Sequence, residues 1–441
     1  MNPKLLCVIS CPIDTFSGYG ARSRDFVESL IQLKGEEWDI RIMAQRWGNT
    51  PWNFLPSDHP YRQLFIGNNL PKRPDIWIQV TVPNEFQPVG QYNIGVTAGI
   101  ETTIMPGEFI EGMNRMDLNL VSSKHSKQAA HSSQFEKRNS NGKVEKVIKL
   151  EKPCEVLFEG LDLSKYFKDP KKSGILDDVK EEFCFLYTGH WLNGKLGEDR
   201  KNTGLMIKTF LETFNTPSKN KPALILKTNQ VNYSLIDREN ILKKINGIKT
   251  TVTGNLPNIY LVHGELTDSE MNLLNNDSKV KAFVSFTKGE GYGRPLKEAA
   301  ITGKPTIASN WSGHVDFLKP DYNCLIGGEL KNVCKSAVNE WIIPESQWFS
   351  IDTKIASKAM KDVFKNYKKY IKNSRKQTQY LKDNWSFEKM KEKLNNLLPE
   401  VKVEAAPPIH QTLKLPKLKK VSNKKQALPK LKLPKLKKIE S

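Results

Sequence analysis

The chain has 441 residues, a formal net charge of +20 and a mean hydropathy of −0.52. This length suffices for two α/β domains with their own cores and an extension. No stretch approaches the roughly 20 apolar residues of a membrane-spanning helix, and the start lacks the regions of a signal peptide, so an integral membrane or secreted protein is not expected. Six cysteines without C-x-x-C spacing favour reduced thiols over a metal site.

The first part of the chain alternates apolar runs of strand length with helical patterns. We expect helices near 26–31 and 108–116, and strands at 4–10, 40–44, 76–82, 93–98, 118–122 and 144–148. This alternation predicts a parallel sheet. The first strand leads through Ser17-Gly-Tyr-Gly into a helix, as in a Rossmann-like half domain, although the three glycines of G-x-G-x-x-G are not all present. Taken alone, this motif is also explained by a tight turn.

The second part repeats the alternation after a lysine-rich stretch, 168–180, whose Pro170 and Gly174 indicate a linker. Helices are expected at 205–214, 235–248 and 267–274, and strands at 183–188, 223–227, 259–262, 282–286, 306–308 and 323–326. A second doubly wound sheet is therefore predicted.

The most informative stretch is 280–303, which reads as a buried strand, a glycine-rich turn and a helix that begins near Arg294. Pro295 is at a favoured first helical position, and glycines at 289, 291 and 293 allow close approach to the backbone. Free N–H groups at the start of a helix, at the carboxyl end of a strand, predict an anion site.

Two acids flank this turn: Glu290 precedes the helix and Glu298 lies one turn inside it. Carboxylates accept hydrogen bonds from sugar hydroxyls, so the arrangement suits a ligand with hydroxylated rings on both sides of a diphosphate. The alternative is that both acids only favour the positive end of a helix dipole.

The string Glu290-Gly-Tyr-Gly-Arg-Pro-Leu-Lys-Glu-Ala resembles the E-x7-E signature of retaining glycosyltransferases with the GT-B fold, especially glycosyltransferase family 4. The resemblance covers about residues 5–398. It implies an α/β protein with two Rossmann-like doubly wound domains that face a cleft. The expected domains are 1–170, an acceptor domain; 171–380, a nucleotide-sugar-binding domain; 381–400, a helix that returns to the first domain; and 401–441, a disordered basic tail.

By the same resemblance, Glu290 contacts the donor sugar, Glu298 binds the ribose hydroxyls, and backbone amides between them hold the diphosphate. A glycine-rich loop lies across the cleft, and a Glu after a strand of the first domain touches donor or acceptor. The donor-binding residues are then Gly18, Gly20, Glu101, Gly291, Tyr292, Gly293, Arg294 and Glu298. A His that several family members carry before this Glu is absent, since Ala98, Gly99 and Ile100 occupy these positions.

The resemblance also implies an Arg and a Lys that neutralise the diphosphate. Lys201 matches the Lys, whereas the customary Gly-Arg is Gly189-His190 here, so Arg200 is the candidate replacement. Cations that favour the charge developing on a nucleoside diphosphate leaving group lower the barrier to its departure. We therefore assign catalytic roles to Glu290, Lys201 and Arg200, and name no protein general base.

The predicted activity is that of a retaining hexosyltransferase that moves a sugar from a UDP-, GDP- or ADP-sugar to a glycan, lipid-linked or other hydroxyl acceptor. No cofactor is expected, and no metal is expected to be obligatory, because the chain has no D-x-D motif. Two alternatives stay open: a basic-tailed protein that binds nucleic acid or transfers sugar to it, and a GT-B epimerase or phosphorylase.

The last 41 residues contain twelve lysines and two glutamates, which is a net charge of +10, and repeat the octapeptide LKLPKLKK. Proline within each repeat and few apolar residues predict disorder. Such a tail is a candidate contact to an anionic membrane surface or to nucleic acid, with a solvated extension as the alternative. We expect a cytoplasmic protein, with peripheral attachment to the inner membrane surface as an option.

Overall fold

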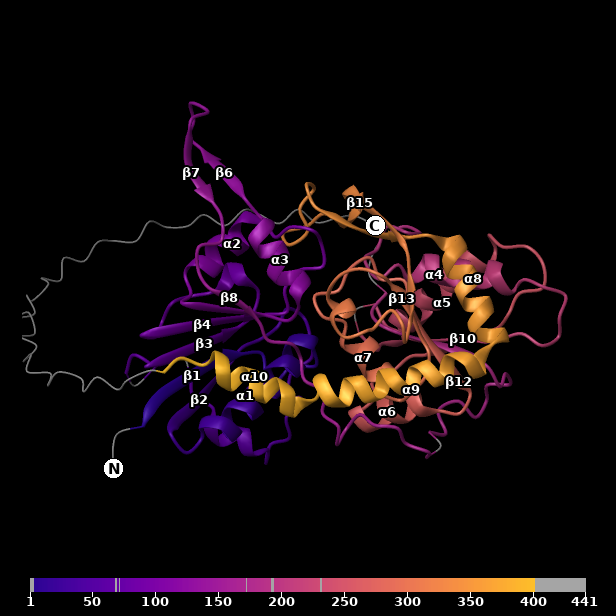
Figure 1. Cartoon of the computed structure of the whole chain (residues 1–441), viewed down its shortest axis with the longest axis horizontal. Helices are drawn as coiled ribbons and strands as arrows, with labels where there is room; N and C mark the ends of the chain where they lie inside the picture. The colour runs from indigo at the N-terminus through magenta and orange to yellow at the C-terminus, as the bar shows by residue number, and fades with distance from the viewer. Residues whose placement is uncertain are drawn as a thin grey trace, which may run out of the picture. The chain divides into compact units, whose positions relative to one another are not determined.

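The computed structural model describes residues 4–67, 70, 72–171, 173–191, 194–230 and 232–400. Two six-stranded sheets, each with every strand parallel to its neighbours, organise this region (Figure 1). We call residues 4–161 the first lobe and residues 173–384 the second lobe. The tail at 401–441, and the predictions made for it, lie outside the described residues.

The sheet of the first lobe has the strand order β2-β1-β3-β4-β5-β8. Its apolar central strands are almost wholly buried, as expected when helices cover both faces of a parallel sheet. The strands are β1 (Leu5–Cys11), β2 (Trp38–Ala44), β3 (Ile76–Val80), β4 (Tyr92–Thr97), β5 (Leu118–Val121) and β8 (Cys154–Val156).

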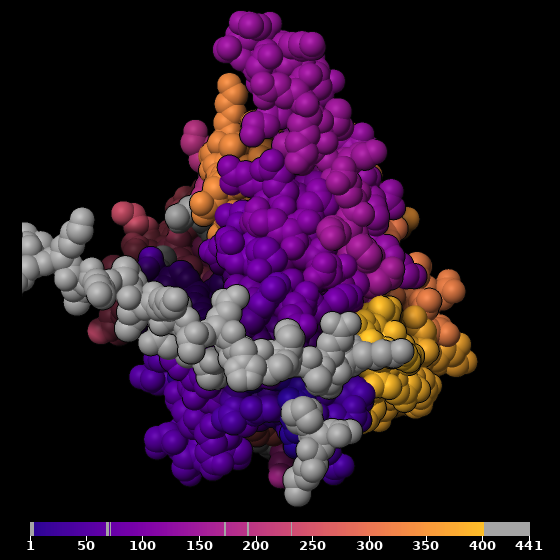
Figure 2. All heavy atoms as spheres, turned by 90° about the vertical axis from the view of Figure 1, so that its left-hand side faces the viewer, coloured from indigo at the N-terminus to yellow at the C-terminus, as the bar shows by residue number. Residues whose placement is uncertain are grey.

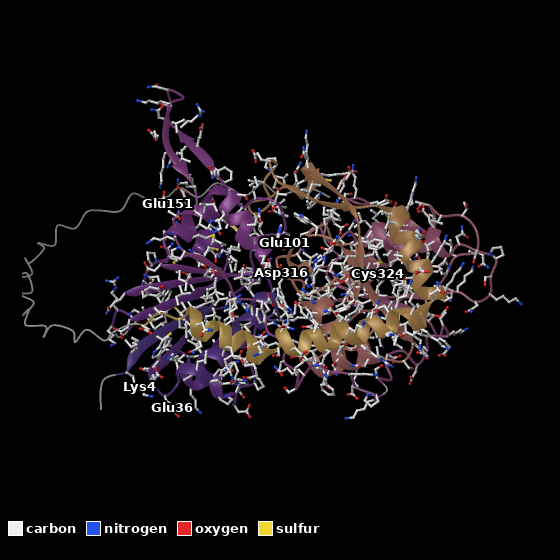
Figure 3. All side chains as sticks on the ribbon, in the orientation of Figure 1. Lys4, Glu36, Glu101, Glu151, Asp316 and Cys324 are labelled. Atoms are coloured by element: carbon white, nitrogen blue, oxygen red, sulfur yellow. The ribbon has the colours of Figure 1, made fainter. Side chains whose placement is uncertain are left out.

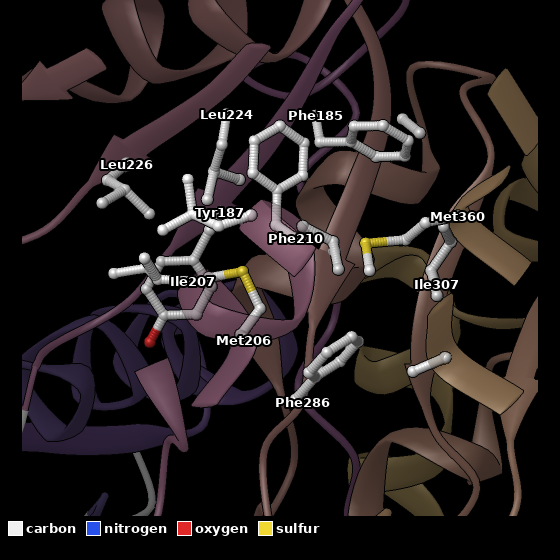
Figure 4. Close-up of a cluster of buried hydrophobic side chains, with 14 of the residues drawn as sticks. Phe185, Tyr187, Met206, Ile207, Phe210, Leu224, Leu226, Phe286, Ile307 and Met360 are labelled. Carbon is white, nitrogen blue, oxygen red and sulfur yellow. The ribbon is translucent and has the colours of Figure 1, made fainter. Parts of the chain in front are cut away.

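The sheet of the second lobe has the order β11-β10-β9-β12-β13-β14, which is the 3-2-1-4-5-6 order of dinucleotide-binding Rossmann folds. Its strands are β9 (Cys184–Thr188), β10 (Ala223–Lys227), β11 (Ile259–Val262), β12 (Val280–Ser285), β13 (Thr306–Ser309) and β14 (Cys324–Ile326). Figure 4 shows the core beside this sheet, where aromatic rings such as Phe185 and Phe210 pack with Met206 and Met360. Both predicted sheets are confirmed.

Helices connect the strands, and several of them begin at a capping side chain. Ser17 caps the first of them by accepting a hydrogen bond from Gly20 N, and Thr267 forms a capping box with Glu270. The helices are α1 (Gly18–Lys34), α2 (Gly107–Asn114), α3 (Lys124–Ser132), α4 (Thr203–Phe214), α5 (Leu235–Lys249), α6 (Asp268–Asn276), α7 (Arg294–Ala300), α8 (Thr353–Lys365), α9 (Tyr367–Asn384) and α10 (Phe387–Leu397), with 3₁₀ turns η1 (Pro60–Leu64), η2 (Pro83–Glu85), η3 (Gly313–Asp316) and η4 (Lys335–Ala337).

Two antiparallel hairpins stand outside the sheets. One consists of β6 (Phe135–Arg138) and β7 (Val144–Ile148), so the strand predicted at 144–148 pairs within a hairpin and the last place in the first sheet goes to β8. Figure 2 shows this hairpin at the top of the face that the first lobe presents. The other consists of β15 (Gly328–Asn332) and β16 (Gln347–Ile351).

The chain returns to the first lobe through α10, which packs against α1 and places Lys391 Nζ 2.8 Å from Gln32 Oε1. Near its start, Leu161 N donates to Trp385 O and Phe387 N donates to Leu161 O. Gly160 packs so closely here that a Cβ would lie 2.7 Å from Phe387 Cα. Within the described residues, no helix combines the length and apolarity needed to cross a bilayer.

Candidate functional site

Each sheet has a point at which its strand order reverses, and ligands of such folds bind beyond the carboxyl ends of the strands there. In the second lobe this point lies between β9 and β12, whose following loops carry Arg200 and Lys201, and Glu290. In the first lobe it lies between β1 and β3, and β1 leads to the start of α1. The candidate site is built from these loops and from the loop after β4.

The central cluster joins four residues that the sequence analysis singled out. Lys201 Nζ lies 2.7 and 2.9 Å from the two carboxylate oxygens of Glu290, and Arg200 Nη1 lies 3.4 Å from Glu290 Oε2. Arg200 also reaches the first lobe, where its Nη2 is 3.3 Å from Glu101 Oε1. Figure 3 places Glu101 in the region where the two lobes meet. The structure therefore brings Glu101, Arg200, Lys201 and Glu290 together.

These charges shift one another's pKa values. Burial alone would raise the pKa of Glu290, but Lys201 and Arg200 outweigh it and lower the value to about 2. Burial lowers the pKa of Lys201, an effect that Glu290 offsets in part. Glu101 and Glu290 together overcome the burial of Arg200 and raise its pKa. The carboxylate of Glu290 is thus stabilised by the two basic side chains beside it.

The glycines of the turn after β12 are required by close packing against the first lobe. A Cβ on Gly289 would lie 1.9 Å from Glu101 O, and one on Gly291 would lie 2.2 Å from Ala98 O. Ser122 Oγ donates to Ala98 O or Gly291 O, at 2.6 and 3.0 Å. The backbone of this turn therefore lies directly on the loop that carries Glu101.

Ser312, which the sequence analysis did not single out, supports the same turn. Glu290 N donates to Ser312 Oγ at 2.9 Å, and Gly313 N donates to Glu290 O. Ser312 has φ 79° and ψ −160°, a conformation that residues other than glycine rarely adopt. Strained backbone of this kind persists where its surroundings fix it, and here it holds the backbone on both sides of Glu290 in place.

A second cluster surrounds Arg294 at the start of α7. Its Nε lies 2.9 Å from Glu298 Oε1, and its Nη1 lies 2.6 Å from Asp25 Oδ2 and 3.5 Å from Glu159 Oε2. Burial raises the pKa of Glu298 to about 7 despite Arg294. The three carboxylates outweigh the burial of Arg294 and raise its pKa well above the ordinary value. One guanidinium thus ties α7 to α1 and to the segment after β8.

A buried polar network fixes the segment 157–160 between the lobes. Arg22 donates to Phe158 O at 2.9 Å and to Leu157 O at 2.5 Å. Tyr292 OH donates to Glu159 O at 2.8 Å. Lys297 Nζ donates to the same Glu159 O and to the hydroxyl oxygen of Tyr292. The side chain of Tyr292 is consequently buried in this network, which leaves its backbone for the predicted contact to a donor.

The predicted glycine turn of the first lobe forms the first turn of α1. Gly20 packs against the preceding loop, since a Cβ there would lie 2.3 Å from Thr15 O, whereas a Cβ on Gly18 would meet nothing within 4 Å. Tyr19 OH accepts a hydrogen bond from Ala98 N at 3.1 Å. Because Gly291 packs on Ala98, the first turn of α1 and the turn after β12 contact the same residue.

Asp25 and Glu159 are not among the site residues predicted from the sequence. Asp25 is one acid on an amphipathic helix, and Glu159 follows a short strand that was not predicted, so neither carries a local signal. Only the fold brings them to Arg294. Across the described residues, no three His, Cys, Asp or Glu side chains gather as a metal site would require.

No protein-family model matches the sequence, and no curated protein matches it. Solved structures do match its fold. The sucrose-phosphate synthase of Thermosynechococcus elongatus is 10% identical over 90% of this chain and 98% of its own, with a TM-score of 0.56. HepE of Anabaena in complex with UDP and glucose is 11% identical over 89% and 99%, with a TM-score of 0.57. A glycosyltransferase of Rickettsia africae is 13% identical over 90% and 98%, with a TM-score of 0.55.

Proposed function

We propose that this chain, which has the GT-B fold shared with these structures, is a glycosyltransferase that uses a nucleotide-sugar donor. The observation that carries the proposal is the cluster of Glu290, Lys201, Arg200 and Glu101 between the two lobes. HepE, which binds UDP and glucose, supports the assignment by its fold.

Lys201 and Arg200 are proposed to bind the donor diphosphate. Both are paired with carboxylates in this structure, and their side chains are only 15% and 17% exposed, so their charges are poorly screened by water. A diphosphate carries more negative charge than one carboxylate, and bond cleavage increases that charge. These cations therefore stabilise the departing nucleoside diphosphate more strongly than the intact donor.

Glu290 is proposed to orient the donor sugar by accepting hydrogen bonds from its hydroxyls. A carboxyl with a pKa of about 2 is ionised at neutral pH and is a poor proton acceptor, so this side chain is ill suited to general acid or base catalysis. In the reaction that we propose, the bond from the anomeric carbon to the phosphate breaks, and the departing phosphate takes the proton of the attacking hydroxyl. Attack on the same face gives retention of configuration.

The finer assignments follow from the sequence resemblance and are part of the proposal. Glu298 binds the ribose hydroxyls, the turn from Gly291 to Gly293 meets the diphosphate, and a hexose is transferred to a hydroxyl acceptor without an obligatory metal. The reaction takes place in the cytoplasm, with the 401–441 tail as the candidate contact to an anionic membrane or nucleic acid.

The experiment is to incubate the protein with UDP-, GDP- and ADP-hexoses and a panel of hydroxyl acceptors, with and without EDTA, and to identify products by NMR. We expect one donor to release its nucleoside diphosphate and yield a glycoside with the donor's anomeric configuration, with EDTA having no effect. An inverted product, a requirement for metal, or a free epimerised nucleotide sugar would each overturn the corresponding part of the proposal.

A further inference from the structure

Three aromatic rings from distant parts of the chain form a stack beside the candidate site. Tyr19 lies in the first turn of α1, Trp47 follows β2, and Trp341 lies in the loop between β15 and β16. The rings of Tyr19 and Trp47 are 4.0 Å apart and inclined by 27°, and those of Trp47 and Trp341 are 6.3 Å apart and inclined by 28°. We call these three residues the aromatic platform.

The platform borders the loop after β4 that carries Glu101. At one end, Tyr19 OH is hydrogen-bonded to Thr97 Oγ1 at 2.8 Å and to Ala98 N at 3.1 Å. At the other end, the loop that holds Trp341 leads into Gln347, whose backbone N–H and C=O each pair with Thr103 at 2.9 Å. Because Glu101 lies between these two attachments in the sequence, the platform borders the loop that contributes Glu101 to the central cluster.

The platform keeps an apolar face available to a ligand. Tyr19 and Trp47 pack on the core of the first lobe and are half-buried, whereas Trp341 is 38% exposed. The rings of Trp47 and Trp341 are stacked, so the face of Trp341 turned away from Trp47 is the one left for a ligand. Trp341 lies in a hydrogen-bonded turn. Asn339 Oδ1 accepts hydrogen bonds there from the backbone N–H groups of Trp341 and Ile342, at 2.8 and 2.9 Å.

The chemistry of the platform matches a sugar ring. One face of a pyranose is made of C–H groups and packs on an aromatic ring, while its hydroxyls remain free to reach polar groups or water. A large aromatic side chain offers on the order of 150–250 Å², which is the scale of one sugar ring and not of an extended acyl chain.

We propose that the acceptor is a glycan, and that one of its sugar rings stacks on Trp341, at the exposed end of the aromatic platform. This inference rests on the proposed glycosyl transfer and narrows its acceptor from any hydroxyl compound to a carbohydrate. Since Trp341 belongs to the second lobe and Trp47 to the first, the acceptor subsite is complete only where the lobes meet.

The first test measures binding of oligosaccharides to the full chain by saturation-transfer NMR, without any donor. We expect at least one oligosaccharide to bind the wild type, and Trp341→Ala to weaken this binding about tenfold, as loss of an aromatic anchor does. Trp341→Phe keeps a flat ring and should retain most of the affinity. Phe167→Ala is the matched control, because Phe167 is also 38% exposed but lies in the linker between the lobes. If the wild type binds no oligosaccharide, or if Trp341→Ala binds as well as the wild type, the inference is overturned.

The second test separates this inference from the proposed function. Hydrolysis of the nucleotide sugar, measured without an acceptor as release of nucleoside diphosphate, reports the donor site alone. We expect Trp341→Ala to leave this release and the donor KM unchanged while the KM for a sugar acceptor rises about tenfold. Failure of the wild type to bind or cleave any donor would contradict the proposed function. Transfer to long-chain alcohols but not to sugars would contradict the glycan acceptor only.

Discussion

Glu290 and Glu298, the two acids that flank the turn after β12, lie in opposite electrostatic environments. Glu290 faces two cations and has its pKa lowered to about 2, whereas burial raises the pKa of Glu298 to about 7. They lie on one short turn and helix, yet one is fixed as an anion and the other is poised to change its charge near neutral pH. This difference suits a carboxylate that orients a sugar beside a diphosphate, and a second that meets neutral ribose hydroxyls.

For Glu290, we predict a contribution to stability that disappears in acid. Its pKa is lower in the folded protein than the ordinary 4.5, so its ion pairs stabilise the fold above that pH and are lost as the pH falls toward 2. The stability advantage of the wild type over Glu290→Gln, measured by urea unfolding, should shrink by on the order of 3 kcal/mol over this interval. A difference that stays constant with pH would refute the ion pairs.

For Glu298, the predicted dependence has the opposite sign. Its pKa is higher in the folded protein, so the folded state binds the extra proton and the wild type loses stability as the pH rises from about 4.5 to about 7. Relative to Glu298→Gln, the wild type should become less stable across this range and show no further change above it. Urea unfolding over this pH range tests the prediction. If the stability of the wild type relative to Glu298→Gln rises with pH, the burial of the Glu298 carboxyl is contradicted.

At the scale of elements, the turn after β12 and the loop after β4 form the contact on which the site depends. Their backbones approach so closely that neither Gly289 nor Gly291 has room for a Cβ. A side chain at these positions would push the two lobes apart, which would separate Arg200 from Glu101. The glycines that the sequence suggested for phosphate binding thus also serve lobe-to-lobe packing.

We predict that Gly291→Ala lowers kcat/KM about 100-fold, since displacing a catalytic arrangement by about 1 Å has effects of this size. Gly247→Ala is the control, because a Cβ at this helical position meets nothing within 4 Å. Steady-state kinetics of both variants, with circular dichroism to verify folding, make the comparison. Equal activity of the two variants would show that the close contact is dispensable.

The sequence predicts the elements best where an apolar run or a helix-start signal has clear ends. The ends of β10 and β11 fall where the apolar runs end, and α7 begins at Arg294 as expected from Pro295. It fails at β8, which is only three residues long, and at the β15–β16 hairpin, whose first strand is fully exposed. Within the site, Glu290 and Lys201 are recognisable by their motif, whereas Asp25, Glu159 and Ser312 gain their roles from contacts between distant segments.

At the scale of the whole molecule, the described residues through Pro399 form one compact unit. We therefore predict that a chain ending at Glu400 keeps the wild-type melting temperature and its activity on soluble acceptors. The tail's twelve lysines should give the full chain salt-dependent binding to vesicles of anionic lipid, or to nucleic acid, that the shortened chain lacks. Sedimentation with vesicles and a nucleic-acid gel shift distinguish the two. Equal binding by both chains would contradict a role for the tail.

The central claim is that the cluster around Glu290 receives the diphosphate of a nucleotide sugar, and a calorimetric titration with the nucleoside diphosphate tests it most directly. We predict that Lys201→Gln weakens binding about 10-fold to 100-fold, the size of a lost charge-assisted hydrogen bond, while the exposed Lys219→Gln binds like the wild type. If the wild type binds no nucleoside diphosphate, or if both variants bind it as the wild type does, the cluster is not a donor site.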